Sequence, residues 1–291
     1  MRVAVTGSSG FVGRALVPLL EARGHKAISL GRDATGDIVA FREWPRLLEG
    51  LDVVVHLAAL AHGAGVDEAR LRAVNVDVAA AIGRAAAEHG VRMVFLSSVK
   101  ALGEDSTGRS LSESSQLAPV DAYGRAKADA ERALGAIERL RLTILRPPLV
   151  YGPGVKANFL SLLHAVARGW PLPLASVDNR RSLVYLGNLC DAIAHSIESP
   201  RALGRTYCVS DGAPVSTPEL CRALGAALGR SVRLFRFPVA LLELAPLLKK
   251  LTRSLEVDDG PLRRELGWSP PFSFEGGVRA TAQWYRERGA R

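Results

Sequence analysis

Several features that would place this chain of 291 residues in other classes of protein are scarce or missing. Its 3 cysteines, Cys190, Cys208 and Cys221, are odd in number and have no metal-ligand spacing, so we expect neither a disulfide framework nor a metal site. No run of roughly twenty apolar residues is present that would predict a membrane span. The most apolar stretch, 237–248, is interrupted by two prolines and a glutamate, which favours a pair of helices.

The chain also lacks a clustered basic stripe, although its formal net charge is +9. The arginines are spread along the sequence without interleaved aromatic residues, so nucleic acid is not an expected partner. A positive field would instead attract an anionic small molecule. The N-terminus shows no signal-peptide pattern, so we expect a cytoplasmic protein, and the sequence leaves a homodimer open.

What is present is a strand that runs into a glycine turn and then a helix. Residues 2–6 are a short apolar run typical of a buried parallel strand. Gly7, Gly10 and Gly13 follow at the spacing G-x-x-G-x-x-G, with a helix expected from Phe11 to Arg23. Gly7 suits a reversal with positive φ, Gly10 allows a pyrophosphate to approach, and Gly13 allows close helix packing. The helix N-terminus then favours phosphate, although an ordinary strand-turn-helix also explains the pattern.

A second strand, expected over residues 27–30, ends at Gly31, Arg32 and Asp33. An acidic residue at this tip binds the ribose 2′-hydroxyl of NAD, whereas an arginine suits the 2′-phosphate of NADP. Arg32 therefore favours NADP, and Asp33 beside it leaves NAD open.

Tyr123 and Lys127 are four residues apart, so on a helix they share one face. An adjacent ammonium and an oxidised nicotinamide ring would both lower the phenol pKa from about 10 towards the range in which a general acid–base works. The same spacing also occurs on ordinary surface helices. Upstream, an apolar strand over 91–97 leads to Ser98, which would bond a substrate oxygen at the carboxyl edge of the sheet, or cap the next turn.

Taken together, these motifs resemble the extended short-chain dehydrogenase/reductase family, the nucleotide-sugar epimerases, dehydratases and reductases. The resemblance runs along nearly the whole chain and is carried by Thr6–Gly13, Asp37-Ile38, His56–Ala59, Asn75, Ser97-Ser98, Tyr123 with Lys127, Arg146–Pro153 and Arg264–Trp268.

The resemblance implies roles for individual residues. Ser98, Tyr123 and Lys127 would be catalytic, with Tyr123 as the general acid–base. The cofactor NAD(P) would contact Gly7, Ser9, Gly10, Phe11, Val12, Arg32, Asp37, Ile38, Leu57, Ala58, Ala59, Asn75, Ser97, Tyr123, Lys127 and Pro147. A UDP-sugar substrate would contact Ser98, Lys100, Asn158 and Arg181, the last as the pyrophosphate-binding arginine.

Departures from the family pattern reduce the number of reactions that we expect of this chain. Dehydratases carry Asp-Glu directly after the catalytic hydroxyl, where this chain has Val99 and Lys100, so 4,6-dehydration is not expected. Segments 97–103, 155–160 and 179–183 resemble the branch that reduces UDP-4-keto-6-deoxy-N-acetylglucosamine in bacterial surface polysaccharide synthesis. We therefore expect an NAD(P)-dependent C4-ketoreductase. A UDP-hexose 4-epimerase that retains NAD, or a non-catalytic dinucleotide sensor, are the alternatives.

The alternation of strands and helices predicts an α/β fold with a Rossmann-type, doubly wound parallel sheet. Further strands are expected over 52–57 and 142–146, and helices over 67–89 and 122–140. We expect a dinucleotide-binding domain over residues 1–150 and, over 151–291, mainly a smaller substrate lobe with some segments returning to the sheet.

Overall fold

The computed structural model describes residues 1–60, 67–106 and 108–289. A six-stranded parallel sheet has the order β2-β1-β3-β4-β5-β8. Its strands are β1 (Arg2–Thr6), β2 (Lys26–Leu30), β3 (Val53–His56), β4 (Arg92–Leu96), β5 (Arg141–Arg146) and β8 (Thr206–Cys208). The predicted doubly wound sheet is confirmed, and the five strands predicted from the sequence are each found within one residue at either end.

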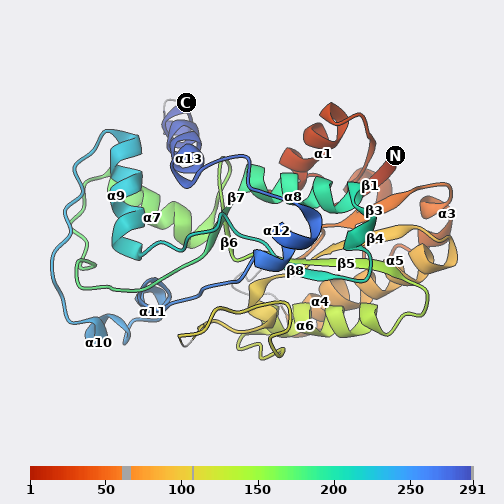
Figure 1. The fold of residues 1–291 in the computed structure, drawn as a ribbon, viewed down its shortest axis with the longest axis horizontal. Coiled ribbons are helices and arrows are strands. Elements are labelled where there is room, and N and C mark those ends of the chain that lie inside the picture. Colours follow the sequence, from red (N-terminus) through yellow and green to blue (C-terminus); the bar gives the residue numbers. More distant parts are fainter. Residues whose placement is uncertain (61–66, 107, 290–291) are drawn as a thin grey trace.

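Helices cover both faces of this sheet (Figure 1). On one face, α1 (Gly13–Ala22) and α8 (Leu186–Glu198) pack against the strands through an apolar core. On the other face lie α3 (Trp44–Leu48), α5 (Val78–Glu88) and α6 (Ala122–Gly135). The strands are buried on both sides, which explains why they read as continuous apolar runs.

Three helix predictions differ from the structure. The first helix begins at Gly13 and not at Phe11, because residues 11 and 12 still belong to the glycine turn. The helix expected over 67–89 is split into α4 (Glu68–Arg72), a π-helical turn (Ala73–Asp77) and α5. α6 ends at Gly135, and the chain reverses through Arg139 at a φ of 61° before β5.

The chain order of the strands creates a switch point beside β1. The chain moves from β1 outward to β2 and then returns to β3 on the opposite side of β1. In open α/β sheets the crevice at the carboxyl ends of such strands is where ligands bind. The glycine turn after β1 and the segment after β3 both lie there.

A smaller second part follows β5. β6 (Leu149–Tyr151) and β7 (Leu183–Tyr185) form a two-stranded parallel sheet. α7 (Ala157–Ala167), α9 (Thr217–Leu228) and α13 (Phe274–Gly289) share an apolar core beside it (Figure 1). The short helices are α2 (Arg32–Thr35), α10 (Val239–Leu242), α11 (Pro246–Thr252) and α12 (Gly260–Leu266).

The stretch 237–248 contains two short helices, as predicted, since α10 and the start of α11 lie within it. Among the described residues, no helix combines the length and the apolar character needed to cross a lipid bilayer.

Candidate active site

The glycine turn after β1 has the geometry of a phosphate-binding turn. Gly7 has a φ of 67°, and a Cβ at this position would lie 2.8 Å from the Ala58 nitrogen. A Cβ on Gly13 would lie 2.4 Å from the Gly7 oxygen, so the atoms that require glycine here belong to the turn itself, whereas the expected reason was close packing of the helix. The N–H groups of Phe11 and Val12 have no hydrogen-bond acceptor within the described part of the chain. These free donors at the start of α1 fit a pyrophosphate.

The predicted adenine end of the site carries exposed charges. Arg32 is the first residue of α2 and is exposed to solvent, as is Asp33. The Asp37 carboxylate forms an ion pair with Arg70 at 2.8 Å, and this hydrogen bond lowers the pKa of Asp37. Ile38 is half-buried. Arg32 is therefore positioned to meet a ligand from solvent, whereas the Asp37 side chain is already paired.

The Asn75 side chain bonds to the segment after β3 and does not point into an open cavity. Its Oδ1 accepts the Leu60 N–H at 2.8 Å, and its Nδ2 donates to the Leu60 carbonyl at 2.9 Å. Asn75 lies in the π-helical turn, a feature often found at functional sites. Leu57 and Ala58 are half-buried and Ala59 is exposed. Asn75 thus fixes the edge that these residues form.

Ser97 faces away from the edge of the sheet. Its hydroxyl bonds to the Glu131 carboxylate, which Arg146 engages at 2.6 and 3.1 Å, and all three residues are buried. The Ser97 side chain is therefore committed to a core ion pair. The Pro147 carbonyl accepts the Val99 N–H at 3.0 Å, which ties the end of β5 to the segment after β4.

The three predicted catalytic residues come from two adjoining elements. Ser98 caps a 3-10 turn (Val99–Ala101), with its hydroxyl accepting the Lys100 N–H at 3.2 Å. Tyr123 and Lys127 lie on α6, which packs on that turn. A Cβ on Gly124 would lie 2.5 Å from the Lys100 carbonyl oxygen, so glycine next to Tyr123 permits this close approach.

Burial shifts the pKa values of both residues on α6. The Lys127 ammonium donates to the Leu96 carbonyl at 2.7 Å and lies 5.9 Å from the centroid of the Tyr123 ring. Burial lowers the pKa of Lys127 to about 8, and Glu131 partly opposes the shift. Burial, followed by the Asp121 charge, raises the pKa of Tyr123 to about 12. In the protein without ligands the phenol is thus more strongly protonated than usual, the opposite of the direction expected with an oxidised cofactor.

Lys100 is held by carboxylates. Its ammonium bonds to Asp121 and, at 2.7 Å, to Glu104. Burial opposes the charged form, but these bonds outweigh it and raise the pKa of Lys100. Asp121 also accepts the Gly124 N–H at 2.7 Å and so caps α6 two residues before Tyr123. The predicted substrate-binding lysine is therefore part of the support for α6.

The paired arginines of the lobe point in different directions, as their alternation in an extended segment predicts. Arg181 is half-buried and donates to the Arg253 carbonyl at 2.8 Å. Burial lowers its pKa, and the charges of Glu104 and Asp105 oppose the shift. Arg180 is exposed and pairs with Glu256 at 3.0 Å. Arg181 thus faces the same ion cluster as Lys100, whereas exposed Asn158, on the first turn of α7, is not part of that cluster.

An open cavity of about 410 Å³ lies beside the glycine turn. It is lined by Ser9, Gly10, Phe11, Arg14, Ala15, Pro153, Gly154, Lys156, Tyr185, Leu186 and Gly187. Two segments far apart in the sequence therefore form one concave surface with the start of α1.

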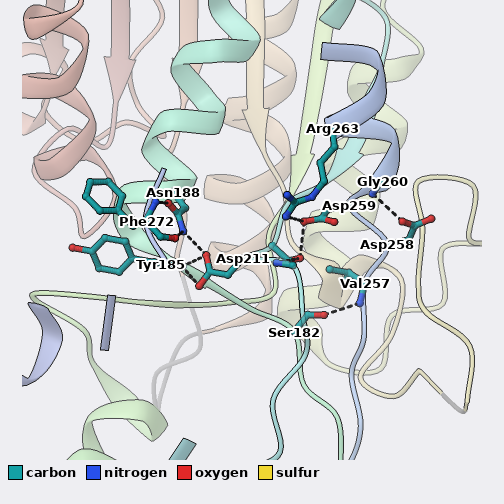
Figure 2. Close-up of polar contacts among 12 residues, drawn as sticks. Ser182, Tyr185, Asn188, Asp211, Val257, Asp258, Asp259, Gly260, Arg263 and Phe272 are labelled. Atoms are coloured by element: carbon teal, nitrogen blue, oxygen red, sulfur yellow. Dashed lines mark hydrogen bonds and ion pairs between the residues drawn. The ribbon is translucent and has the colours of Figure 1, made fainter. Parts of the chain in front are cut away.

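Sequence reasoning missed the polar network that holds one wall of this cavity. Figure 2 shows the Asp211 carboxylate receiving the Tyr185 backbone N–H at 2.9 and 3.0 Å and the Asn188 amide at 2.7 Å. The Tyr151 hydroxyl donates to the same carboxylate at 2.9 Å. Asn188 also bonds the backbone of Phe272 in both directions at 2.9 Å. Burial raises the pKa of Asp211. The only indication in the sequence was an aspartate and a glycine after a short apolar run.

Comparison with known proteins agrees with this geometry. The profile of the NAD dependent epimerase/dehydratase family matches residues 3–210. The chain belongs to this family. It is an enzyme of the extended short-chain dehydrogenase/reductase type, so the non-catalytic sensor is set aside.

Its relatives catalyse more than one reaction. The chain is 36% identical over 309 residues to a UDP-glucose 4-epimerase of Vibrio cholerae, covering 97% of this chain and 94% of that protein. It is 28% identical over 322 residues to a ceramide reductase of Caulobacter vibrioides, covering 99% and 95%. A dTDP-glucose 4,6-dehydratase of Streptomyces venezuelae, solved with NAD and TYD bound, is 28% identical with a TM-score of 0.80, covering 100% of this chain and 98% of that one.

Proposed function

We propose that this enzyme reduces the C4 ketone of a UDP-linked 4-keto-6-deoxy-N-acetylhexosamine, with NAD(P)H as the hydride source. The free N–H groups of Phe11 and Val12 would hold the cofactor pyrophosphate, with Arg32 near the adenosine ribose. The bound cofactor supplies the hydride. The chain itself supplies the proton and the position of the sugar.

The observation that carries the proposal is the placement of Tyr123 and Lys127 on α6 against the turn that Ser98 caps, at the carboxyl end of β4. The Tyr123 phenol, whose pKa burial raises, is protonated at neutral pH and can donate its proton to a carbonyl oxygen as that oxygen gains charge. Lys127 lies on the same face of α6 as Tyr123, and its ammonium donates to the Leu96 carbonyl at the end of β4. Ser98, which follows β4, offers a hydroxyl. Tyr123 would act as the acid and Ser98 would orient the ketone.

The charges around the site support a keto sugar over a dehydration substrate. A dehydratase needs an acid to protonate the departing C6 hydroxyl, and Lys100 stands at that position, held by Asp121 and Glu104. Arg181 lies by the same cluster and would engage the substrate diphosphate. The relatives named for UDP- and dTDP-sugars are the reason for assigning a sugar nucleotide.

A UDP-hexose 4-epimerase is the second candidate, because the relative from Vibrio cholerae is named as one. One experiment separates the two. The purified protein is incubated with UDP-4-keto-6-deoxy-N-acetylglucosamine and NADH or NADPH, and the loss of absorbance of the reduced cofactor is followed. Stoichiometric consumption supports the reductase. Absence of consumption, together with tightly bound NAD released on denaturation and interconversion of UDP-glucose and UDP-galactose, would establish the epimerase instead.

A further inference from the structure

The end of the lobe farthest from the six-stranded sheet carries an unusual concentration of exposed apolar side chains. Figure 1 places α10 at this end, at the lower left. Leu244 is 78% exposed and Leu241 is 52% exposed, and Phe235 and Phe237 precede them in the chain and are also exposed. Leu242 of α10 is buried in the lobe core, so α10 has one inward and one outward apolar side.

A second segment adds to this apolar surface. The Leu172 N–H donates to the Arg233 carbonyl at 2.8 Å, and the Phe235 N–H donates to the Leu172 carbonyl at 3.0 Å. The segment that contains Trp170, which is 53% exposed, therefore runs beside residues 233–235. Phe235 and Phe237 are two residues apart in this extended segment, so their side chains share a face.

Exposed basic residues lie close to these apolar ones along the chain. The exposed cations in the stretch are Arg230, Arg233, Arg236, Lys249 and Lys250. None of them has an ion-pair partner among the described residues. The single acidic residue of the stretch, Glu243, is turned to the Thr252 hydroxyl at 3.1 Å and to Arg253 at 3.9 Å. The surface is thus strongly positive and apolar at once.

We propose that residues 230–245 and 248–250, with Trp170, form a surface that docks on an anionic lipid bilayer. Aromatic and leucine side chains flanked by lysine and arginine are the pattern of segments that lie in the bilayer interface. A second copy of this chain would bring the same unpaired cations face to face, which is repulsive. A soluble polyanion would satisfy the cations but leave Leu241 and Leu244 in water. The docking is peripheral, and it depends on no step of the proposed reaction.

The test is sedimentation of the full chain with vesicles of phosphatidylcholine, with and without phosphatidylglycerol. The protein should sediment with the anionic vesicles and be released by salt. Arg233→Gln with Lys249→Gln should lower the partition coefficient about 25-fold, since each cation near an anionic surface contributes about fivefold. Leu241→Ser with Leu244→Ser should lower it at least about tenfold. Arg84→Gln with Arg201→Gln removes two exposed charges elsewhere and should leave binding unchanged.

Three results would overturn the proposal. The first is no sedimentation with anionic vesicles at low salt. The second is equal binding by the parent and both surface variants. The third is a dimer in solution that the leucine variant dissociates, without vesicle binding, which would give this surface to a second copy. The four positions changed in the two surface variants are all exposed, and thermal unfolding of each variant checks its fold. Should the leucine variant unfold, the variant that lacks Arg233 and Lys249 tests the same surface alone.

Discussion

Lys127 should reduce the stability of the protein at neutral pH. It is only 2% exposed, and burial lowers its pKa from 10.5 to about 8. At 1.36 kcal/mol per unit, that gap means that the charged form is disfavoured by about 3 kcal/mol in the folded state. The unfolded chain therefore binds more protons than the folded one between pH 8 and 10.5. Stability from this group rises with pH across that window, and below pH 8 the full penalty applies.

Replacing Lys127 with Met removes the charge and keeps most of the side-chain volume. The relief of about 3 kcal/mol is offset by about 1–2 kcal/mol for removing the donor to the Leu96 carbonyl. We expect Lys127→Met to raise the free energy of unfolding by about 1–2 kcal/mol at pH 7, while turnover falls. Near pH 10.5 the advantage should disappear or reverse, because a neutral lysine keeps its hydrogen bond without the penalty.

Urea unfolding followed by circular dichroism, at pH 7 and again near the upper end of the window, measures both values for the ligand-free proteins. Lys26→Met is the matched control, because Lys26 is exposed and its replacement should change stability by less than about 0.5 kcal/mol. A Lys127→Met protein that is less stable than the parent at pH 7, or a difference that does not shrink as pH rises, would refute the argument.

Three further predictions concern the predicted site. Tyr123→Phe should lower turnover at least about a hundredfold with near-normal cofactor affinity, measured by single-turnover rates and dinucleotide titration, because it removes only the proton donor. Arg32→Ala should weaken NADPH and spare NADH in the same titration, and equal effects on both would exclude a 2′-phosphate contact. Arg181→Ala should raise the KM for the UDP-sugar at least about tenfold, the value of a charge-assisted bond, without changing dinucleotide affinity. Arg180→Ala, on the exposed side, should do much less, and unchanged UDP binding by the Arg181 variant would place the substrate elsewhere.

The sheet could be predicted from the sequence because its strands are buried on both faces. Val3, Ala4 and Val5 are fully buried, and such runs are legible without knowledge of their neighbours. The π-helical turn at Asn75 could not be predicted, since nothing in the local composition distinguishes it from the helices on either side. The strands β6 and β7 have only three residues each, too few for a pattern of burial to appear.

The surroundings of the site residues were harder to predict, because the residues that they contact are distant in the sequence. Ser97 was expected at the cofactor, but the carboxylate that takes its hydroxyl comes from α6, and that carboxylate is fixed by Arg146 of β5. Asp211 shows the converse. It has no motif, yet β6, β7 and α8, which meet only after folding, each direct a donor at it. Figure 2 shows the donors from Tyr185 and Asn188. Motifs therefore predicted the edge of the sheet at which we propose the chemistry, and tertiary contacts decide which side chains remain free there.

The same contacts bear on the direction of the proposed reaction. For oxidation of a sugar hydroxyl, Tyr123 would have to lose its proton first, which needs positive charge close to the phenol. The Lys127 ammonium lies 5.9 Å from the ring and is bonded to the Leu96 carbonyl, while the Asp121 charge acts in the opposite sense. For reduction, the phenol needs only the proton that it already holds. The protein's own charges thus hold the proton on the phenol, so donation depends on the charge that hydride transfer places on the ketone oxygen, and a retained oxidised cofactor would have to supply positive charge before the epimerase cycle could begin.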